Sequence, residues 1–201
     1  MDRDELKRLH DGTLTNLLKI LRVKDFLSFK KSPLPISIIV SAFYTTAVAI
    51  SGKSYEKILV VINSSLNIIP DLLGFTLAGL TIIVAFGNTE YLKSLSRIKQ
   101  NLDGLKPSLF QKMVAVFTWS ILIQGVCLSF SFLISLIIDL NLSIQSVSLT
   151  SVVNTGVLFI STLLITYSVF LLPKTVLNVF RFGQGHHFKL FFENQKEDKQ
   201  E

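Results

Sequence analysis

The sequence is poor in the residues that build disulfides, metal sites and catalytic centres. Its 201 residues include one cysteine, Cys127, so a disulfide framework is excluded. It has no glycine-rich phosphate loop, nucleophile elbow or paired carboxylates. The three histidines, His10, His186 and His187, have no cysteine or acid at ligand spacing. We therefore expect no metal site, no cofactor and no enzymatic activity.

Charge is almost absent from four long apolar runs, Leu34–Ser51, Ile58–Phe86, Met113–Ile138 and Val152–Leu172. Each run is close to the ~20 residues that a helix needs to cross ~30 Å of hydrocarbon. A lone strand would leave its backbone groups unpaired in lipid. The pattern predicts an all-α membrane protein with four transmembrane helices and no room for a separate soluble enzyme domain.

Positive charge is nearly missing from one side of these runs. Of 20 Lys and Arg residues, eight precede the first run, two separate the first and second, five the second and third, none the third and fourth, and five follow. The positive-inside rule then predicts that both termini and the middle loop lie in the cytoplasm. The net charge of +6 on this rim serves either contact with anionic lipid or binding of an anionic ligand.

The order of segments follows from these runs. Residues 1–33 are a cytoplasmic segment with an amphipathic helix, Thr13 to Phe29, capped by Thr13 and lying on the inner membrane surface. The transmembrane domain, 34–173, has a cytoplasmic loop at 88–112 and spans at 34–51, 68–87, 113–138 and 152–172. Residues 174–201 are expected to form a cytoplasmic C-terminal helix, stopped at Gly183-Gln184-Gly185, and a charged tail.

The second run is too long for one perpendicular span and contains Pro70. Residues 55–70 are either a separate interfacial segment or part of a long second span kinked at Pro70. Asp71, the only acid inside a run, is either a functional carboxylate or a first-turn residue near the outer interface. After Phe86 we expect a helix up to Gln100, followed by a turn at 101–104.

Two of the runs carry a stripe of small and polar residues on one helical side. The second run has Asp71, Gly74, Ala78, Thr81 and Ala85, which Asn63, Ser64 and Asn67 extend if the helix is continuous. The third has Ser120, Gln124, Cys127, Ser131 and Ser135. Each stripe is either a helix-packing surface or the lining of a pore, and in an oligomer both interpretations can hold. Gln124 and Ser131 are the pore-lining candidates of the third run.

A resemblance to a known family rests on the second and third runs. From Leu73 the chain reads LGFTLAGLTIIVAF, followed by a polar turn, Tyr91-Leu92-Lys93-Ser94-Leu95 and a span with an early Trp119. This pattern resembles a family of small four-span bacterial membrane proteins encoded in anti-phage defence operons, the membrane effectors of the Hailong type. It covers about Pro70 to Phe132.

The resemblance implies an inner-membrane homo-oligomeric effector, a tetrameric channel held closed by single-stranded oligodeoxyadenylate from a partner nucleotidyltransferase. By position and charge, the phosphate-binding candidates are Lys93, Arg97, Lys99, Lys106, Arg181 and Lys189, with aromatic platforms at Phe180, Phe182 and Phe188. The alternative is a holin-like or anchoring membrane subunit without a regulated channel.

The predicted topology can be tested by reporter fusions or cysteine labelling. Positions near Asp11, Gln100 and Lys196 should lie in the cytoplasm, and positions at Gly52 and Ser143 outside, because positive charge is retained on the inner side. Labelling of Ser143 from the cytoplasmic side alone would rule out the four-span arrangement.

Overall fold

The computed structural model describes residues 12–21, 32–85, 89–96, 99–101, 104–140 and 147–197. Contacts group the chain into two units. The four-helix unit comprises residues 24–75 and 120–172, and the α6 unit comprises 1–23, 76–119 and 173–201.

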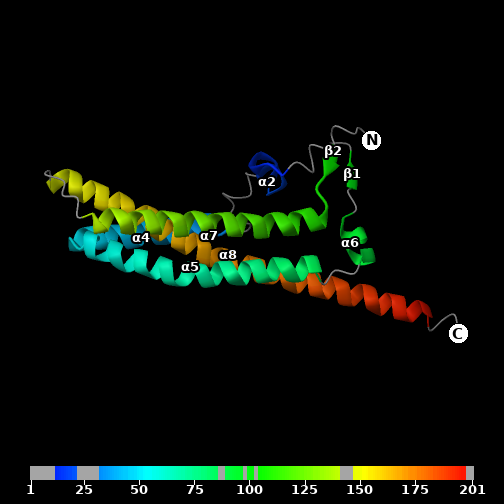
Figure 1. Cartoon of the computed structure of the whole chain (residues 1–201). Coiled ribbons are helices and arrows are strands. Elements are labelled where there is room, and N and C mark those ends of the chain that lie inside the picture. The colour runs from blue at the N-terminus through cyan, green and yellow to red at the C-terminus, as the bar shows by residue number, and fades with distance from the viewer. Residues whose placement is uncertain are drawn as a thin grey trace. The chain divides into compact units, whose positions relative to one another are not determined.

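Six helices and one short hairpin make up the described chain (Figure 1). They are α2 (Leu14–Leu21), α4 (Leu34–Ser51), α5 (Ser54–Ala85), α6 (Thr89–Leu95), β1 (Lys99–Asn101), β2 (Gly104–Lys106), α7 (Leu109–Asp139) and α8 (Val147–Glu197). Helices α4, α5, α7 and α8 are each long and apolar enough to cross a membrane. The prediction of an all-α membrane protein with four transmembrane helices is confirmed, whereas the side on which the termini lie stays a prediction.

Local signals fix both ends of α4, whose bounds coincide with the first expected span. The Leu34 N–H donates to Ser32 Oγ at 3.2 Å, and prolines occupy the first turn, where no backbone donor is needed. At the other end Gly52 adopts a left-handed conformation with φ 68, and its N–H donates to the Ala49 carbonyl. This conformation favours glycine and lets the chain turn directly into α5.

Helix α5 is one continuous helix with Pro70 in its interior. A separate segment at 55–70 is therefore wrong, because these residues belong to one long helix with the second span. Its 32 residues make α5 about 48 Å long, which exceeds the ~30 Å of hydrocarbon. Asp71 lies 17 residues after Ser54, so its assignment to the first turn of a helix is also wrong.

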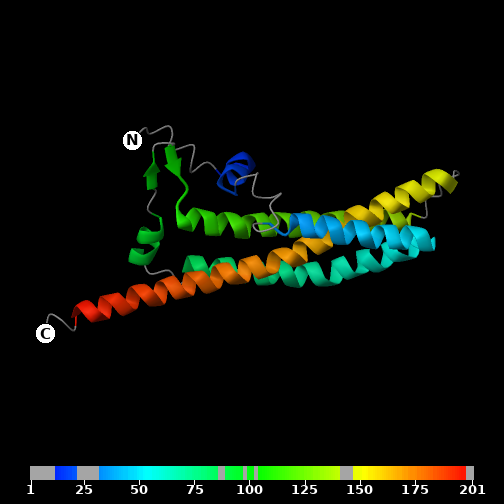
Figure 2. The same ribbon diagram turned by 180° about the vertical axis from the view of Figure 1, so that it is seen from behind.

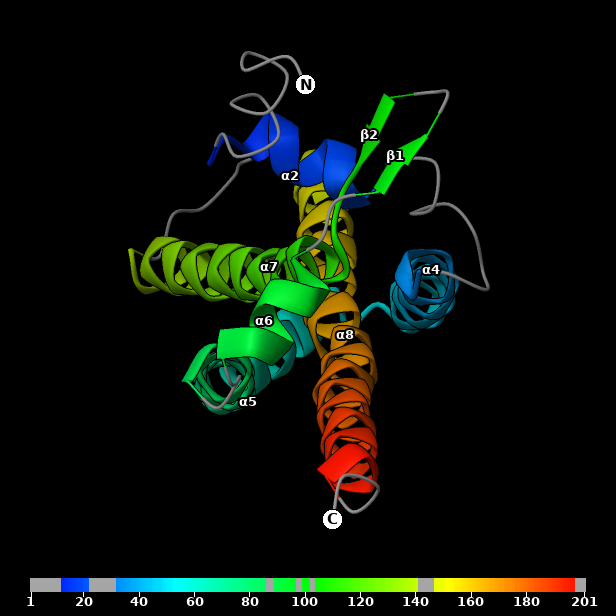
Figure 3. The same cartoon turned by 90° about the vertical axis from the view of Figure 1, so that its right-hand side faces the viewer.

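The loop between the second and third spans differs from the expected helix up to Gln100. Helix α6 ends at Leu95, and β1 then pairs with β2 in an antiparallel hairpin with Lys99 opposite Lys106 (Figure 3). Residues 102–103 of the turn expected at 101–104 lie outside the described residues. Near the N-terminus, Thr13 Oγ1 accepts the Asn16 N–H at 3.4 Å and caps α2, while residues 22–31 of the expected amphipathic helix lie outside the described residues.

Helix α8 does not stop at Gly183-Gln184-Gly185 but continues to Glu197. The reason is a contact within the α6 unit. Tyr91 of α6 is buried, and its hydroxyl donates to the Phe182 carbonyl at 3.2 Å. The Tyr91 ring also lies against the rings of Phe182 and His186, with centroids 5.4 Å and 5.2 Å away. A Cβ on Gly185 would collide with the Tyr91 hydroxyl. Gly185 thus permits a close approach rather than ending the helix.

Burial strengthens the preference of Tyr91 for the protonated form that this contact needs. Removal from water disfavours the charged phenolate and raises the pKa of Tyr91. The hydroxyl therefore stays a donor to the Phe182 carbonyl over the physiological pH range. Ile83 and Phe117 complete the buried cluster around Tyr91 and Phe182.

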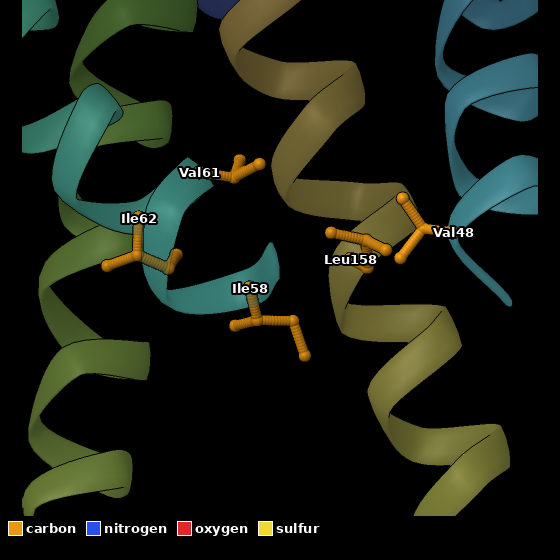
Figure 4. Packing of buried hydrophobic residues seen from close by; sticks show 5 residues of the cluster. All are labelled: Val48, Ile58, Val61, Ile62 and Leu158. Carbon is orange, nitrogen blue, oxygen red and sulfur yellow. The ribbon is translucent and has the colours of Figure 1, made fainter. Parts of the chain in front are cut away.

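The four-helix unit has a separate apolar cluster. Val48 of α4 meets Leu158 of α8, and Ile58, Val61 and Ile62 of α5 belong to the same cluster (Figure 4). Helices α4 and α8 run side by side in opposite directions there, as seen from both sides in Figures 1 and 2. This cluster fixes the register between α4, α5 and α8.

The contact at Gly185 yields a stability prediction with a matched control two residues away. Gly185→Ala should lower the free energy of unfolding by about 1–3 kcal/mol, because the new methyl group meets Tyr91. Gly183→Ala, whose Cβ meets no described atom within 4 Å, should raise it by about 0.5–1 kcal/mol through helix propensity. Thermal unfolding in detergent measures both.

The double variant Gly185→Ala plus Tyr91→Phe supplies the control for mechanism. Removing the hydroxyl removes the atom that collides, so part of the lost stability should return. Equal unfolding temperatures for Gly185→Ala and Gly183→Ala would contradict the contact.

Candidate functional site

The four-helix unit buries polar side chains beside its apolar cluster and exposes apolar side chains on its outside. On α4 the buried side carries Ser37, Ser41 and Thr45, whereas Phe43 and Ile50 are 77% and 83% exposed. Water-soluble helices show the opposite arrangement, with apolar residues inside. An apolar exterior suits lipid as the surrounding solvent, so the chain is a multi-pass membrane protein.

The polar stripe of α7 lies inside the four-helix unit. Ser120, Gln124 and Ser131 have no exposed surface, and Cys127 is 1% exposed. Leu122, Val126 and Phe132, on the other side of α7, are exposed. Within one chain the stripe therefore acts as a packing surface. The pore-lining role of Gln124 and Ser131 stays a prediction that only a rearranged bundle would satisfy.

The polar stripe of α5 has the opposite orientation. Its buried side carries Ile62, Ile69 and Ile83. At 100° per residue, the exposed small and polar residues lie roughly opposite that side. We call them the polar face of α5: Asn63, Asn67, Asp71, Gly74, Ala78, Thr81 and Ala85, all exposed. The two stripes, which the sequence could not tell apart, thus separate into an inward and an outward one.

None of the described residues packs closely enough against Gly74 to require a glycine at this position. A Cβ there would meet no described atom within 4 Å. By contrast, a Cβ on Gly79, which is buried, would lie 2.9 Å from Phe117 Cε1. Gly79 is therefore small because α7 approaches it. Beside Gly74, by contrast, the described residues leave open space.

The polar face of α5 is also too long to lie entirely outside the hydrocarbon of the membrane. From Asn63 to Ala85 it extends for about 33 Å, which matches the ~30 Å hydrocarbon thickness. Thr81 satisfies its own hydroxyl by donating to the Leu77 carbonyl at 2.9 Å. The amides of Asn63 and Asn67 and the carboxylate of Asp71 offer more hydrogen-bonding groups than one helix can serve. Facing these groups to lipid costs several kcal/mol.

The basic candidates lie in the α6 unit. Lys93 on α6 and Arg181 on α8 are exposed, and Lys99 and Lys106 hold paired positions in the hairpin. Lys189 lies within α8, and Arg97 lies outside the described residues.

Of the three aromatic platforms, Phe180 and Phe188 are exposed. Phe182 is buried against Tyr91, so its expected role as a stacking platform is wrong. Within the described ranges, no three His, Cys, Asp or Glu side chains gather in a way that could hold a metal ion.

Sequence reasoning missed the buried hydroxyl groups of α4 and α8. Ser37, Ser41 and Thr45 face the interior from α4, and Ser161, Thr162 and Ser168 face it from α8. A signal was available, because the three α4 residues recur every four positions in an otherwise apolar run.

Comparison with known proteins finds no match to this chain among protein-family models, curated proteins or solved structures.

Proposed function

We propose that the chain assembles as a homo-oligomer, with a tetramer favoured, and forms an ion-conducting pore in the bacterial inner membrane lined by the polar face of α5. The pore acts as a membrane effector in anti-phage defence, and its opening dissipates the membrane potential. An anionic nucleotide or oligonucleotide gates it on the cytoplasmic side.

The observation that carries this proposal is the orientation of the polar face of α5. It lies opposite the buried side of its own helix, over a length comparable to the bilayer core. Lipid hydrocarbon makes no hydrogen bonds to Asn67 and Asp71, so further copies of the chain or water must cover these side chains. Copies arranged around a closed rotation axis provide both neighbouring chains and a central water-filled path, because each α5 then faces the same axis.

The composition of the face allows both roles in one assembly. Gly74 and Ala78 form a small-xxx-small pair, which lets neighbouring helices approach closely. Asn63, Asn67 and Asp71 precede this pair along α5 and provide groups that hydrate ions. Packing contacts and a wet path can therefore occupy different stretches of the same helix.

The continuous helix changes the depth expected for Asp71. Asp71 lies about 26 Å along α5 from Ser54. A ring of Asp71 carboxylates would therefore lie near the middle of the pore instead of in its outer half. At that depth it would attract cations on their way through the pore.

The regulatory part of the proposal rests on charge and on the family resemblance. The hairpin register pairs Lys99 with Lys106, so two basic residues occupy opposite positions of the strands and add positive charge that attracts an anion. Lys93 and Arg181 add exposed positive charge to the same unit. A single-stranded oligodeoxyadenylate made by a partner nucleotidyltransferase would fit this chemistry, with Phe180 and Phe188 as exposed stacking surfaces.

Assembly through α5 is tested by Gly74→Leu, with Gly156→Leu as the matched control. Both glycines are exposed, and a Cβ on either meets no described atom within 4 Å, so neither change should unfold the chain. Gly74→Leu should shift the protein to monomers in detergent and abolish toxicity on overexpression, because the side chain separates neighbouring copies. Gly156→Leu should change neither. Intact oligomers and full toxicity in Gly74→Leu would show that α5 faces lipid, as in an anchoring subunit.

Ion selection is tested by Asp71→Asn in reconstituted bilayers. The amide keeps the size and hydrogen-bonding capacity and removes the charge, so the reversal potential under a salt gradient should shift toward zero while assembly persists. The same substitution at Asp139, an exposed acid at the end of α7, is the control and should leave the potential nearly unchanged. A conducting wild type with an unchanged potential in Asp71→Asn would place the path elsewhere.

A further inference from the structure

Hydroxyl groups inside the four-helix unit lack partners in the protein. Five side chains, each less than a tenth exposed, make no hydrogen bond of normal geometry among the described residues: Ser41, Thr45, Ser131, Thr162 and Ser168. A buried hydroxyl without a partner costs about 1–3 kcal/mol. Five of them in one small bundle would be a large fraction of the stability of a domain. They require a partner that the chain does not supply.

Their neighbours show what a hydroxyl in such a bundle ordinarily does. Ser37, Ser65 and Ser161 each donate to the carbonyl four residues earlier, at 3.0 Å, 2.9 Å and 2.8 Å. This local bond satisfies a serine in an apolar medium without any second helix. The five unpartnered hydroxyls do not make it. Their hydrogen-bonding capacity therefore remains available to a ligand in the interior.

Three helices bring such groups together around Cys127. The thiol of Cys127 faces the hydroxyls of Ser65 on α5, Ser131 on α7 and Ser168 on α8. Sulfur is a weak donor and a weak acceptor. Contact with it leaves Ser131 and Ser168 without a hydrogen bond of normal geometry among the described residues. The cluster therefore contains two hydroxyls without a strong partner, those of Ser131 and Ser168, beside Ser65, which donates to the Val61 carbonyl.

Helix α4 adds hydroxyl groups to the same interior. Thr45 lies one turn from Val48, and Thr162 lies one turn from Leu158, with which Val48 packs (Figure 4). Thr45 precedes Val48 along α4, whereas Thr162 follows Leu158 along α8. Because α4 and α8 are antiparallel, both threonines lie on the same side of the Val48–Leu158 contact along the bundle (Figure 2). Both threonines are buried and point away from the outer surface. All four helices thus contribute hydroxyls or a thiol to the interior.

The lining is neutral, and this identifies the ligand. No Asp, Glu, Lys, Arg or His is buried among the described residues. An ion in a low-dielectric interior needs an opposite charge or full coordination. Water needs only two to four neutral hydrogen-bonding partners, which is what clustered hydroxyls provide. Water is therefore the ligand class that this interior fits.

We propose that the interior of the four-helix unit is a water-filled chamber within each chain, and that the thiol of Cys127 is in contact with this water. The chamber is distinct from the polar face of α5, because it is uncharged and lies on the opposite side of that helix. It holds water and conducts no ions. It also makes the single thiol of the chain reachable by protons from solution, although an apolar surface surrounds the bundle.

The S–H stretching band of Cys127 tests the chamber directly, because no other thiol contributes to it. The intact protein in lipid is moved into heavy water, and conversion of S–H to S–D is followed by infrared spectroscopy. The control places the thiol one residue away on the exposed side of α7, as Val126→Cys in a Cys127→Ser background. Exchange of Cys127 should be faster than that of the control by roughly tenfold or more, because exchange requires direct contact with water. Equal or slower exchange at Cys127 would overturn the proposal.

A second comparison asks whether the hydroxyls hold the water. Ser131→Ala plus Ser168→Ala removes two partners next to the thiol and should slow its exchange several-fold. Ser129→Ala, at an exposed position of α7, should leave the rate unchanged. An unchanged rate in the double variant would mean that the serines bind no water. The comparison of Cys127 with Val126→Cys stands even if the double variant does not fold.

Discussion

The rule that every polar group in lipid needs a partner inside the protein governs this structure. Hydrocarbon offers no hydrogen bonds, so an unsatisfied amide, hydroxyl or carboxylate keeps its full cost. The chain places apolar side chains such as Phe43 and Ile50 outside and hydroxyl groups inside. The polar face of α5 departs furthest from this pattern, because it places the amide of Asn67 and the carboxylate of Asp71 on the outside. The assembly that we propose follows from that departure.

Two polar stripes, on α5 and α7, obtain partners in different ways. The stripe of α7 turns inward and meets hydroxyl groups of α5 and α8 around Cys127. The stripe of α5 turns outward, and Gly74 leaves room for a close neighbour. In our account the inward stripe holds water within each chain, and the outward stripe carries the contact between copies. The uncharged interior and the charged face are thus suited to water and to ions respectively.

The sequence predicted what depends on local chemistry. The ends of α4 follow from Pro33, Pro35 and Gly52, and the four spans follow from the absence of charge over about 20 residues. The helix through Gly185 could not be predicted, because its cause is a contact with Tyr91, more than 90 residues earlier. For the site, periodicity found both stripes, but a small and polar stripe has the same pattern whether it faces inward or outward. The direction depends on how the helices pack.

The most direct test of the account is the response of the current to cadmium when a cysteine replaces Asn67, one turn from Asp71 on the polar face of α5. In a Cys127→Ser background, Asn67→Cys would place one thiol per copy around the central path, and thiolates from several copies bind Cd²⁺ together. The account predicts a conducting wild type, and a current in the Asn67→Cys variant that micromolar cadmium blocks and a chelator restores. A current indifferent to cadmium, with the cysteine shown to be present, would contradict it.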